Sequence, residues 1–170
     1  MKRSGVRLKL LLFALAALGT AQLATAQAQP VKAVASEENK IREATTLFYE
    51  ALNTALQGNF EPLSSIWSHS PDTSDFSADG GEESGWNPIH DQIRNVARLY
   101  PNSSIHAQNV TVGGDDNMAY SVVTETIKLR SPDGAIMKFS QRATNIFRRE
   151  GDAWKLLHHH ADGSASGASI

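Results

Sequence analysis

The spacing of hydrophobic and polar residues divides the chain into a helical part and a strand-rich part. Apolar residues recur every three or four positions across residues 37–57. This spacing predicts an amphipathic helix of about five turns, with Ser36 as its N-cap and Gly58 just beyond its end. A short helix is expected over residues 60–67, and a third helix is expected with Asn87 as its N-cap and Pro88 as its first residue.

The second half of the chain changes to the alternation that is typical of strands. Four segments rich in Val, Ile, Thr and aromatic residues are separated by turn sequences that contain Gly, Asp or Pro. A short strand or hairpin is expected around residues 75–78. Helices followed by an antiparallel meander indicate an α+β fold with the helices on one face of a curved sheet. The four long strands are expected at residues 105–112, 118–129, 135–149 and 153–161.

The start of the chain has the pattern of an export signal. Four basic residues precede an apolar run over residues 10–18, and small residues follow up to Ala26. This order predicts a secretory signal peptide over residues 1–26 and a periplasmic or secreted protein. The alternative is an uncleaved membrane anchor, which the short run disfavours because a bilayer span needs about 20 residues. The remaining chain is then a linker (27–37), one domain (38–162) and a disordered tail (163–170).

Composition and charge narrow the classes of function. The 170 residues are 41% hydrophobic, enough to bury the core of one domain, and include no Cys, which excludes disulfides and thiol catalysis. The formal net charge is −2. Cleavage after Ala26 would remove four basic and no acidic residues, leaving 12 basic and 18 acidic residues and a net charge of −6. Nucleic acid is therefore not an expected partner, and neither is the membrane after cleavage.

Several short motifs, in their order along the chain, resemble a known family. They are Gln57-Gly58-Asn59-Phe60, Ile66-Trp67-Ser68-His69, Gly85-Trp86 and a terminal hairpin from Phe147 to His160 that contains Trp154. Over residues 38–162 the chain resembles the SnoaL-like branch of the nuclear transport factor 2-like superfamily.

The resemblance implies a cone-shaped curved antiparallel sheet that wraps around a long N-terminal helix and leaves an internal pocket. It also implies a homodimer that packs through the outer face of the sheet. Relatives include ketosteroid isomerase and polyketide cyclases, but also the non-catalytic association domain of calcium/calmodulin-dependent kinase, so the fold alone does not decide the function.

The run His158-His159-His160 is the first candidate for chemistry. Side chains alternate along a strand, so His158 and His160 share one face and His159 takes the other. We expect His158 and His160 in the pocket, because they continue the aromatic row that starts at Trp154. A bulge would change this phase, and a comparison with the kinase association domain places His159 inward instead. The inward histidines could act as acid or base, satisfy buried polar groups or lie in a dimer interface.

A metal site is not expected, because the sequence supplies no third ligand at a defined position.

Two charged residues are further candidates. Arg142, in the long penultimate strand, could clamp a carboxylate or an enolate-like group, and the alternative is an ion pair with Glu125. Asp75 could supply a carboxylate base, but it belongs to a segment with five acidic and no basic residues, which favours a solvated loop.

Aromatic residues complete the expected pocket and suggest an apolar or aromatic small molecule as ligand. The expected ligand-binding residues are Trp67, His69, Phe76, Trp86, Tyr100, Arg142, His158 and His160.

Three functions remain open at this point. The first is an exported, non-catalytic domain that binds a small molecule. The second is a cofactor-free lyase or isomerase that uses a pocket His with Arg142. The third is a structural dimerisation module with a filled cavity. A titratable His–carboxylate pair that faces the cavity would favour the enzyme over the other two.

Overall fold

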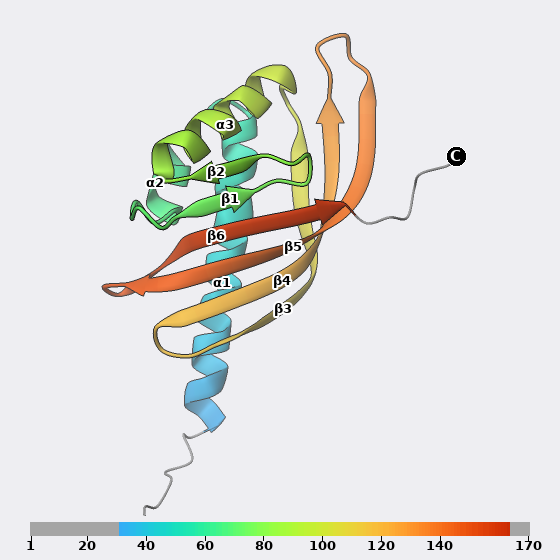
Figure 1. The fold of residues 1–170 in the computed structure, drawn as a ribbon. Helices are drawn as coiled ribbons and strands as arrows, with labels where there is room; N and C mark the ends of the chain where they lie inside the picture. Colours follow the sequence, from blue (N-terminus) through green and yellow to red (C-terminus); the bar gives the residue numbers. More distant parts are fainter. Residues whose placement is uncertain (1–30, 164–170) are drawn as a thin grey trace, which may run out of the picture.

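A computed structural model describes residues 31–163, with side chains from residue 37 onward. The expected signal peptide at residues 1–26 lies outside the described residues, as does nearly all of the expected tail. The elements are three helices and six strands, and Figure 1 shows their arrangement. None of the helices in the described part of the chain is long and apolar enough to cross a membrane.

The three helices are α1 (Val31–Leu56), α2 (Glu61–Ile66) and α3 (Trp86–Leu99). The first helix begins at Val31, five residues before the expected N-cap. Residues 31–35 contain Ala and Lys but no Gly or Pro that would break the helix. Gly58 follows the end of α1 with a φ of 97°, a left-handed conformation that suits glycine. The third helix starts two residues earlier than expected, at Trp86, and its N-cap is Gly85 rather than Asn87.

The strands are β1 (Ser74–Phe76), β2 (Glu82–Ser84), β3 (Ser104–Gly114), β4 (Met118–Arg130), β5 (Ile136–Glu150) and β6 (Ala153–Gly163). They form one sheet in the order β2-β1-β6-β5-β4-β3. The meander of four long strands and the short hairpin near residue 75 are confirmed. The sheet differs from a purely antiparallel one in a single pairing, because β1 runs parallel to β6.

The sheet curls around α1 to form the expected cone fold, which stays open at the edge strands. Figure 1 shows α1 crossing one face of the sheet, while α3 and the β1–β2 hairpin lie together at one end of the molecule. Strand β4 buries Ala119, Val123 and Ile127 against α1 and leaves the alternate residues on the outer face. The helix contributes the side chains of Phe48 and Ala55 to this core, both less than 2% exposed. The core therefore lies between α1 and the concave face of the sheet.

A β-bulge in β6 sets which of its side chains face this core. Phe147 pairs with Leu156 and Ile146 pairs with His158, so Leu157 is an extra residue without a partner on β5. A bulge of this kind shifts the alternation of side chains by one position. Leu156 and His159 are consequently both buried, although they are three residues apart.

Candidate functional site

A row of buried polar side chains crosses the concave face of the sheet. The register places Asp75 of β1 beside His159 of β6, His159 beside Asn145 of β5, and Asn145 beside Ser121 of β4. All four residues are at most 8% exposed. Buried polar groups are costly unless they are hydrogen bonded, so the partners of this row show what it can do.

One hydrogen-bond chain fixes the middle of the row. The amide nitrogen of Asn145 donates to Ser121 Oγ at 3.0 Å and to Tyr49 Oη at 3.3 Å, which leaves its Oδ1 as an acceptor. His159 Nδ1 lies 2.8 Å from that Oδ1 and therefore carries the proton. The other ring nitrogen, Nε2, is then the unprotonated nitrogen of the neutral imidazole. The strand pairing thus presents His159 with a defined tautomer.

A buried glutamate lies next to this chain. Glu125 accepts hydrogen bonds from Tyr49 Oη at 2.7 Å and from Gln141 Nε2 at 2.6 Å, and it is fully buried. Burial raises the pKa of Glu125, while these two donors oppose the rise. Its Oε1 is 3.8 Å from His159 Nε2, too long for a hydrogen bond but close enough for electrostatic coupling. Burial lowers the pKa of His159, so the imidazole stays neutral at pH 7.

Asp75 is the titratable group of the row that has a free oxygen. It is 6% exposed, and its Oδ1 has no hydrogen-bond partner among the described residues. Burial raises the pKa of Asp75 from an ordinary value near 3.8 to about 6, with a smaller opposing effect from His159 and smaller upward effects from Glu125, Glu83 and Asp79. A carboxyl group of this pKa can both accept and release a proton near neutral pH.

Asp75 and His159 both line an internal cavity of about 130 Å³ between α1, α3 and the sheet. Its walls are mostly apolar and include Phe48, Trp67 and Ile93. A second hollow of about 480 Å³ adjoins it and is bordered by the exposed Phe139. The residues that line both spaces are Leu52, Leu56, Ser77, Gln92, Val96 and Gln141. The site is thus an inner chamber with a polar end, reached through a wider apolar space.

The structure places some of the predicted pocket residues at this site and others at its edge. Trp67 lines the inner chamber and Tyr100 the outer hollow. His69, just after the end of α2, stacks on Trp86, the first residue of α3, with ring centroids 4.9 Å apart. Neither residue lines the two spaces. Phe76 lies on the outer side of β1 and makes ring contacts with His158 and His160.

The expectation that His158 and His160 line the pocket is wrong. The bulge at Leu157 shifts the phase of β6, so the row that contains Leu156 continues inward through His159. His158 Nδ1 lies 2.8 Å from Ser74 Oγ, and His160 is exposed. The two rings contact each other on the outer face, with centroids 6.1 Å apart.

Arg142 also lies on the outer face, so neither of its two expected roles is found. Its guanidinium donates to Asp162 through Nε at 3.1 Å and Nη2 at 2.7 Å, and the side chain is 66% exposed. Arg142 follows Gln141, which points inward, and the alternation of the strand sends the next side chain outward. Glu125 is paired with Gln141 and Tyr49 instead.

Sequence reasoning missed four residues of the site or gave them little weight. Glu125 and Asn145 are polar residues in the inward rows of β4 and β5, and their period-two spacing with apolar neighbours could have revealed them. Gln92 stands among the apolar positions of α3, where helical spacing points it to the same side as Ile89 and Val96. Asp75 was expected in a solvated loop, and its burial follows from the parallel pairing of β1 with β6.

The polar groups of this site are acids, bases and hydrogen-bonding groups. Within residues 31–163, no group of three or more His, Asp or Glu side chains is arranged to hold a metal ion. The polar groups that line the inner chamber are one carboxyl, one neutral imidazole, the two amides of Gln92 and Gln141, the Ser77 hydroxyl and the Trp67 indole. These groups can bind a polar substituent and exchange protons with it.

Comparison with known proteins gives the family. Residues 41–162 match the family described as the SnoaL-like domain. The chain belongs to the SnoaL-like domain family. No curated protein matches the chain significantly.

Solved structures place this SnoaL-like domain in the nuclear transport factor 2-like superfamily. A protein from Streptomyces avermitilis described as a candidate dehydratase of that family is similar with a TM-score of 0.70 and 25% identity, over 78% of this chain and 99% of that one. A nuclear transport factor 2-like protein from Salmonella enterica serovar Typhimurium has a TM-score of 0.70 and 16% identity, over 79% and 96%. A candidate calcium/calmodulin-dependent protein kinase II association domain from Xanthomonas campestris has a TM-score of 0.62 and 20% identity, over 74% and 88%.

The latter two similarities establish the cone fold. The family match and the relative from Streptomyces avermitilis support a domain that binds a small molecule or acts as an isomerase- or dehydratase-like domain.

Proposed function

We propose that this SnoaL-like domain binds a small, largely apolar molecule and moves a proton within it as a cofactor-free lyase or isomerase. The observation that carries the proposal is Asp75, a buried carboxyl that lines the cavity beside His159 and whose Oδ1 has no hydrogen-bond partner among the described residues. The relative from Streptomyces avermitilis, named as a candidate dehydratase, is consistent with this reaction class.

The two titratable groups have different roles in this proposal. Asp75 is the base that removes a proton from a carbon next to a carbonyl, and in its protonated form it is the acid that returns one. His159 is held neutral by burial and is oriented by Asn145, so its Nε2 accepts a hydrogen bond or a proton inside the chamber. Apolar walls strengthen both interactions because they exclude water from the reacting atoms. Arg142 has no part in the reaction.

A hydrogen–deuterium exchange assay tests this function without knowledge of the natural substrate. Ring-sized ketones such as cyclohexanone are incubated with the protein in D₂O at pH 7, and deuterium uptake next to the carbonyl is followed by proton NMR. The wild-type protein is expected to accelerate exchange, and Asp75→Asn is expected to lower the protein-dependent rate by about 10²–10⁴-fold, the usual contribution of a general base.

The matched control for this assay is Asp72→Asn, which removes an exposed carboxyl three residues away. Its exchange rate should equal that of the wild-type protein. Exchange at the buffer rate with the wild-type protein, or equal rates for the wild-type protein and Asp75→Asn, would reject the enzymatic proposal. Binding of the ketones without exchange would instead favour the non-catalytic binding domain.

We also propose that the protein is exported and works as a homodimer. The basic–apolar–small order of residues 1–26 supports export, which a mature N-terminus after Ala26 would verify by mass spectrometry. Support for the dimer comes from exposed apolar side chains on β4 and β5. They are Met118, Tyr120, Val122 and Ile136, each 38–47% exposed.

A further inference from the structure

The side chain of Gln92 has an orientation that its surroundings determine. Its Nε2 donates to Ser77 Oγ at 3.1 Å, and Ser77 Oγ donates in turn to Asp79 Oδ1 at 2.5 Å. A flipped amide would place Oε1 against a hydroxyl oxygen whose proton is already used by Asp79. The amide nitrogen of Gln92 therefore faces Ser77, and its oxygen is left as an acceptor.

The turn between β1 and β2 holds this arrangement in place. Gly81 approaches so closely that an added Cβ would lie 2.6 Å from Ser77 Oγ and 3.0 Å from Gln92 Nε2. The backbone N–H of Gly81 also donates to Asp79 Oδ1 at 3.3 Å. A glycine at this position thus allows the turn to pack against the Ser77–Gln92 hydrogen bond.

The oxygen of Gln92 is buried and, among residues 37–163, has no hydrogen-bond partner. Two further polar atoms of residues that line the same chamber share this property, Asp75 Oδ1 and Trp67 Nε1. Two of these three atoms are oxygens that accept hydrogen bonds, and only the indole N–H donates. His159 Nε2 adds another acceptor. A molecule that satisfies the chamber must therefore offer a hydrogen-bond donor, and it gains from an acceptor on the same group.

A hydroxyl group meets both conditions, because it donates one hydrogen bond and accepts others. The size of the chamber limits what carries this group. Its volume of about 130 Å³ is close to the roughly 150 Å³ of a protein cavity that holds benzene. The chamber therefore suits a single six-membered ring, while the outer hollow leaves room for a longer substituent.

We propose that the inner chamber binds the hydroxyl group of a ring-sized, otherwise apolar ligand and that Gln92 Oε1 accepts its hydrogen bond, so that Gln92 determines specificity. This inference rests on the proposed function only in using the same cavity. It assigns Gln92 to recognition and leaves proton transfer to Asp75 and His159.

The test compares phenol with toluene, which has the same ring and a methyl group in place of the hydroxyl. Dissociation constants for the full-length protein are measured by NMR titration at pH 7. A chamber without acceptors would prefer toluene, because the hydroxyl of phenol loses its hydrogen bonds to water on entering an apolar site. The expected result is that phenol binds more tightly than toluene.

The variant Gln92→Leu separates recognition from general packing. Phenol affinity should fall by about five- to tenfold, as expected for the loss of one hydrogen bond, while toluene affinity should not fall. The matched control is Asn95→Leu, which places the same side chain on the exposed side of α3 and should change neither affinity. Unchanged thermal midpoints confirm that each variant is folded.

Three results would overturn the inference. They are equal or tighter binding of toluene by the wild-type protein, a phenol preference that survives in Gln92→Leu, and no binding of either ring. The exchange assay distinguishes a failure of this inference from a failure of the proposed function. If Asp75→Asn abolishes exchange but Gln92→Leu binds phenol normally, the specificity inference is rejected and the proposed enzyme remains.

Discussion

Asp75 and His159 lie opposite each other on the parallel strands β1 and β6, and both line the same internal cavity. This pairing brings a carboxyl from the short hairpin before α3 next to an imidazole from the last strand. Because both groups are buried, the pKa of each is shifted toward its neutral form, which brings the pKa of Asp75 closer to neutral pH. The relationship is the structural basis of the proposed acid–base function.

Burial of Asp75 predicts that its ionised form destabilises the fold. The pKa is about 6 in the folded protein and near 3.8 when the group is exposed, so the folded state holds the proton longer than the unfolded state. The stability contribution is therefore fully present below pH 4 and is lost as pH rises to about 6. We expect Asp75→Asn to be more stable than the wild-type protein at pH 7 by about 1–3 kcal/mol, and similar to it near pH 4. Urea denaturation at several pH values measures this difference.

The control for this prediction is again Asp72→Asn, whose pH dependence has the opposite sign. Hydrogen bonds from Ser70 and Arg148 lower the pKa of the exposed Asp72 carboxyl. Its ionised form is the stabilising one, and this contribution is lost as pH falls through the lowered pKa. A destabilised Asp75→Asn at pH 7 would show that ionised Asp75 does not strain the fold.

The hydroxyl of Tyr49 predicts a second effect on stability. It donates to Glu125 at 2.7 Å, and Tyr49→Phe would leave that oxygen of a buried carboxylate without its donor. We expect a loss of about 2–3 kcal/mol in the free energy of unfolding at pH 7. The loss should be smaller at low pH, where Glu125 is protonated and its charge no longer needs the donor.

The control for this prediction is Tyr120→Phe, at a half-exposed tyrosine, which should change the free energy of unfolding by less than about 0.5 kcal/mol. A loss that is the same at both pH values would mean that the Glu125 charge is not involved.

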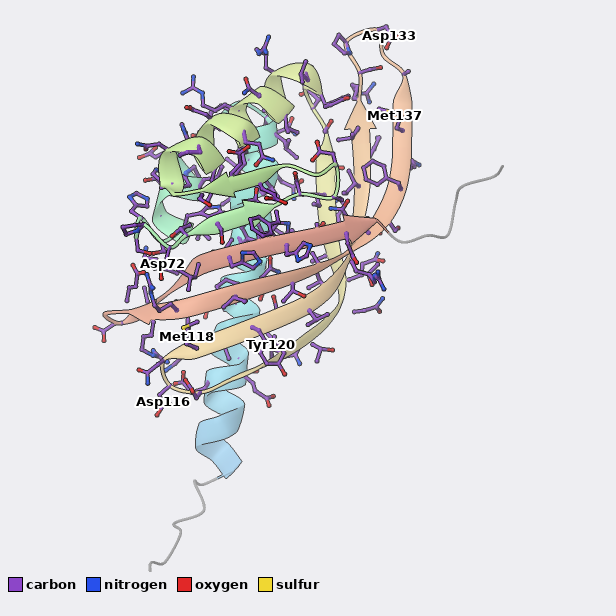
Figure 2. The ribbon with its side chains drawn as sticks, viewed as in Figure 1. Asp72, Asp116, Met118, Tyr120, Asp133 and Met137 are labelled. Carbon is purple, nitrogen blue, oxygen red and sulfur yellow. The ribbon has the colours of Figure 1, made fainter. Side chains whose placement is uncertain are left out.

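The outer face of the sheet predicts a third result. Figure 2 labels Met118 and Tyr120 on β4, and these side chains belong to the exposed apolar set that supports the proposed dimer. The wild-type protein should have the mass of a dimer in multi-angle light scattering. Val122→Lys, in the same row of β4, should weaken the dimer by at least about tenfold, because a charge would be buried without a partner.

Leu47→Lys is the matched control for the dimer, since it places the same charge at an exposed leucine of α1. It should leave the mass of the dimer unchanged. A monomeric wild-type protein would reject the proposed homodimer, and so would an unaffected dimer in Val122→Lys.

The periodicity of the sequence was sufficient to predict the fold. The helical spacing around Phe48 and the alternation around Val123 gave the helices and long strands to within a few residues. The main departure at the start of α1 has a local cause, the absence of a breaking residue after Pro30. The α+β class follows from the order of these elements, and the cone follows from the family resemblance.

The site was harder to predict, because it depends on two features that the alternation of residues does not show. The first is the bulge at Leu157, which turns His159 inward and places His158 and His160 outside. The second is the parallel pairing of β1 with β6, which buries Asp75 although its segment is highly acidic. Both are decided by contacts between residues distant in the sequence, and neither is encoded in the local pattern.

The account depends on Asp75 exchanging its proton near neutral pH beside His159. The most direct measurement is a carbon-13 NMR titration of the aspartate carboxyl groups in the wild-type protein, with Asp75→Asn used to assign the signal. The account predicts a midpoint near pH 6 for Asp75. A midpoint near pH 4, the ordinary value of an exposed aspartate, would contradict the account.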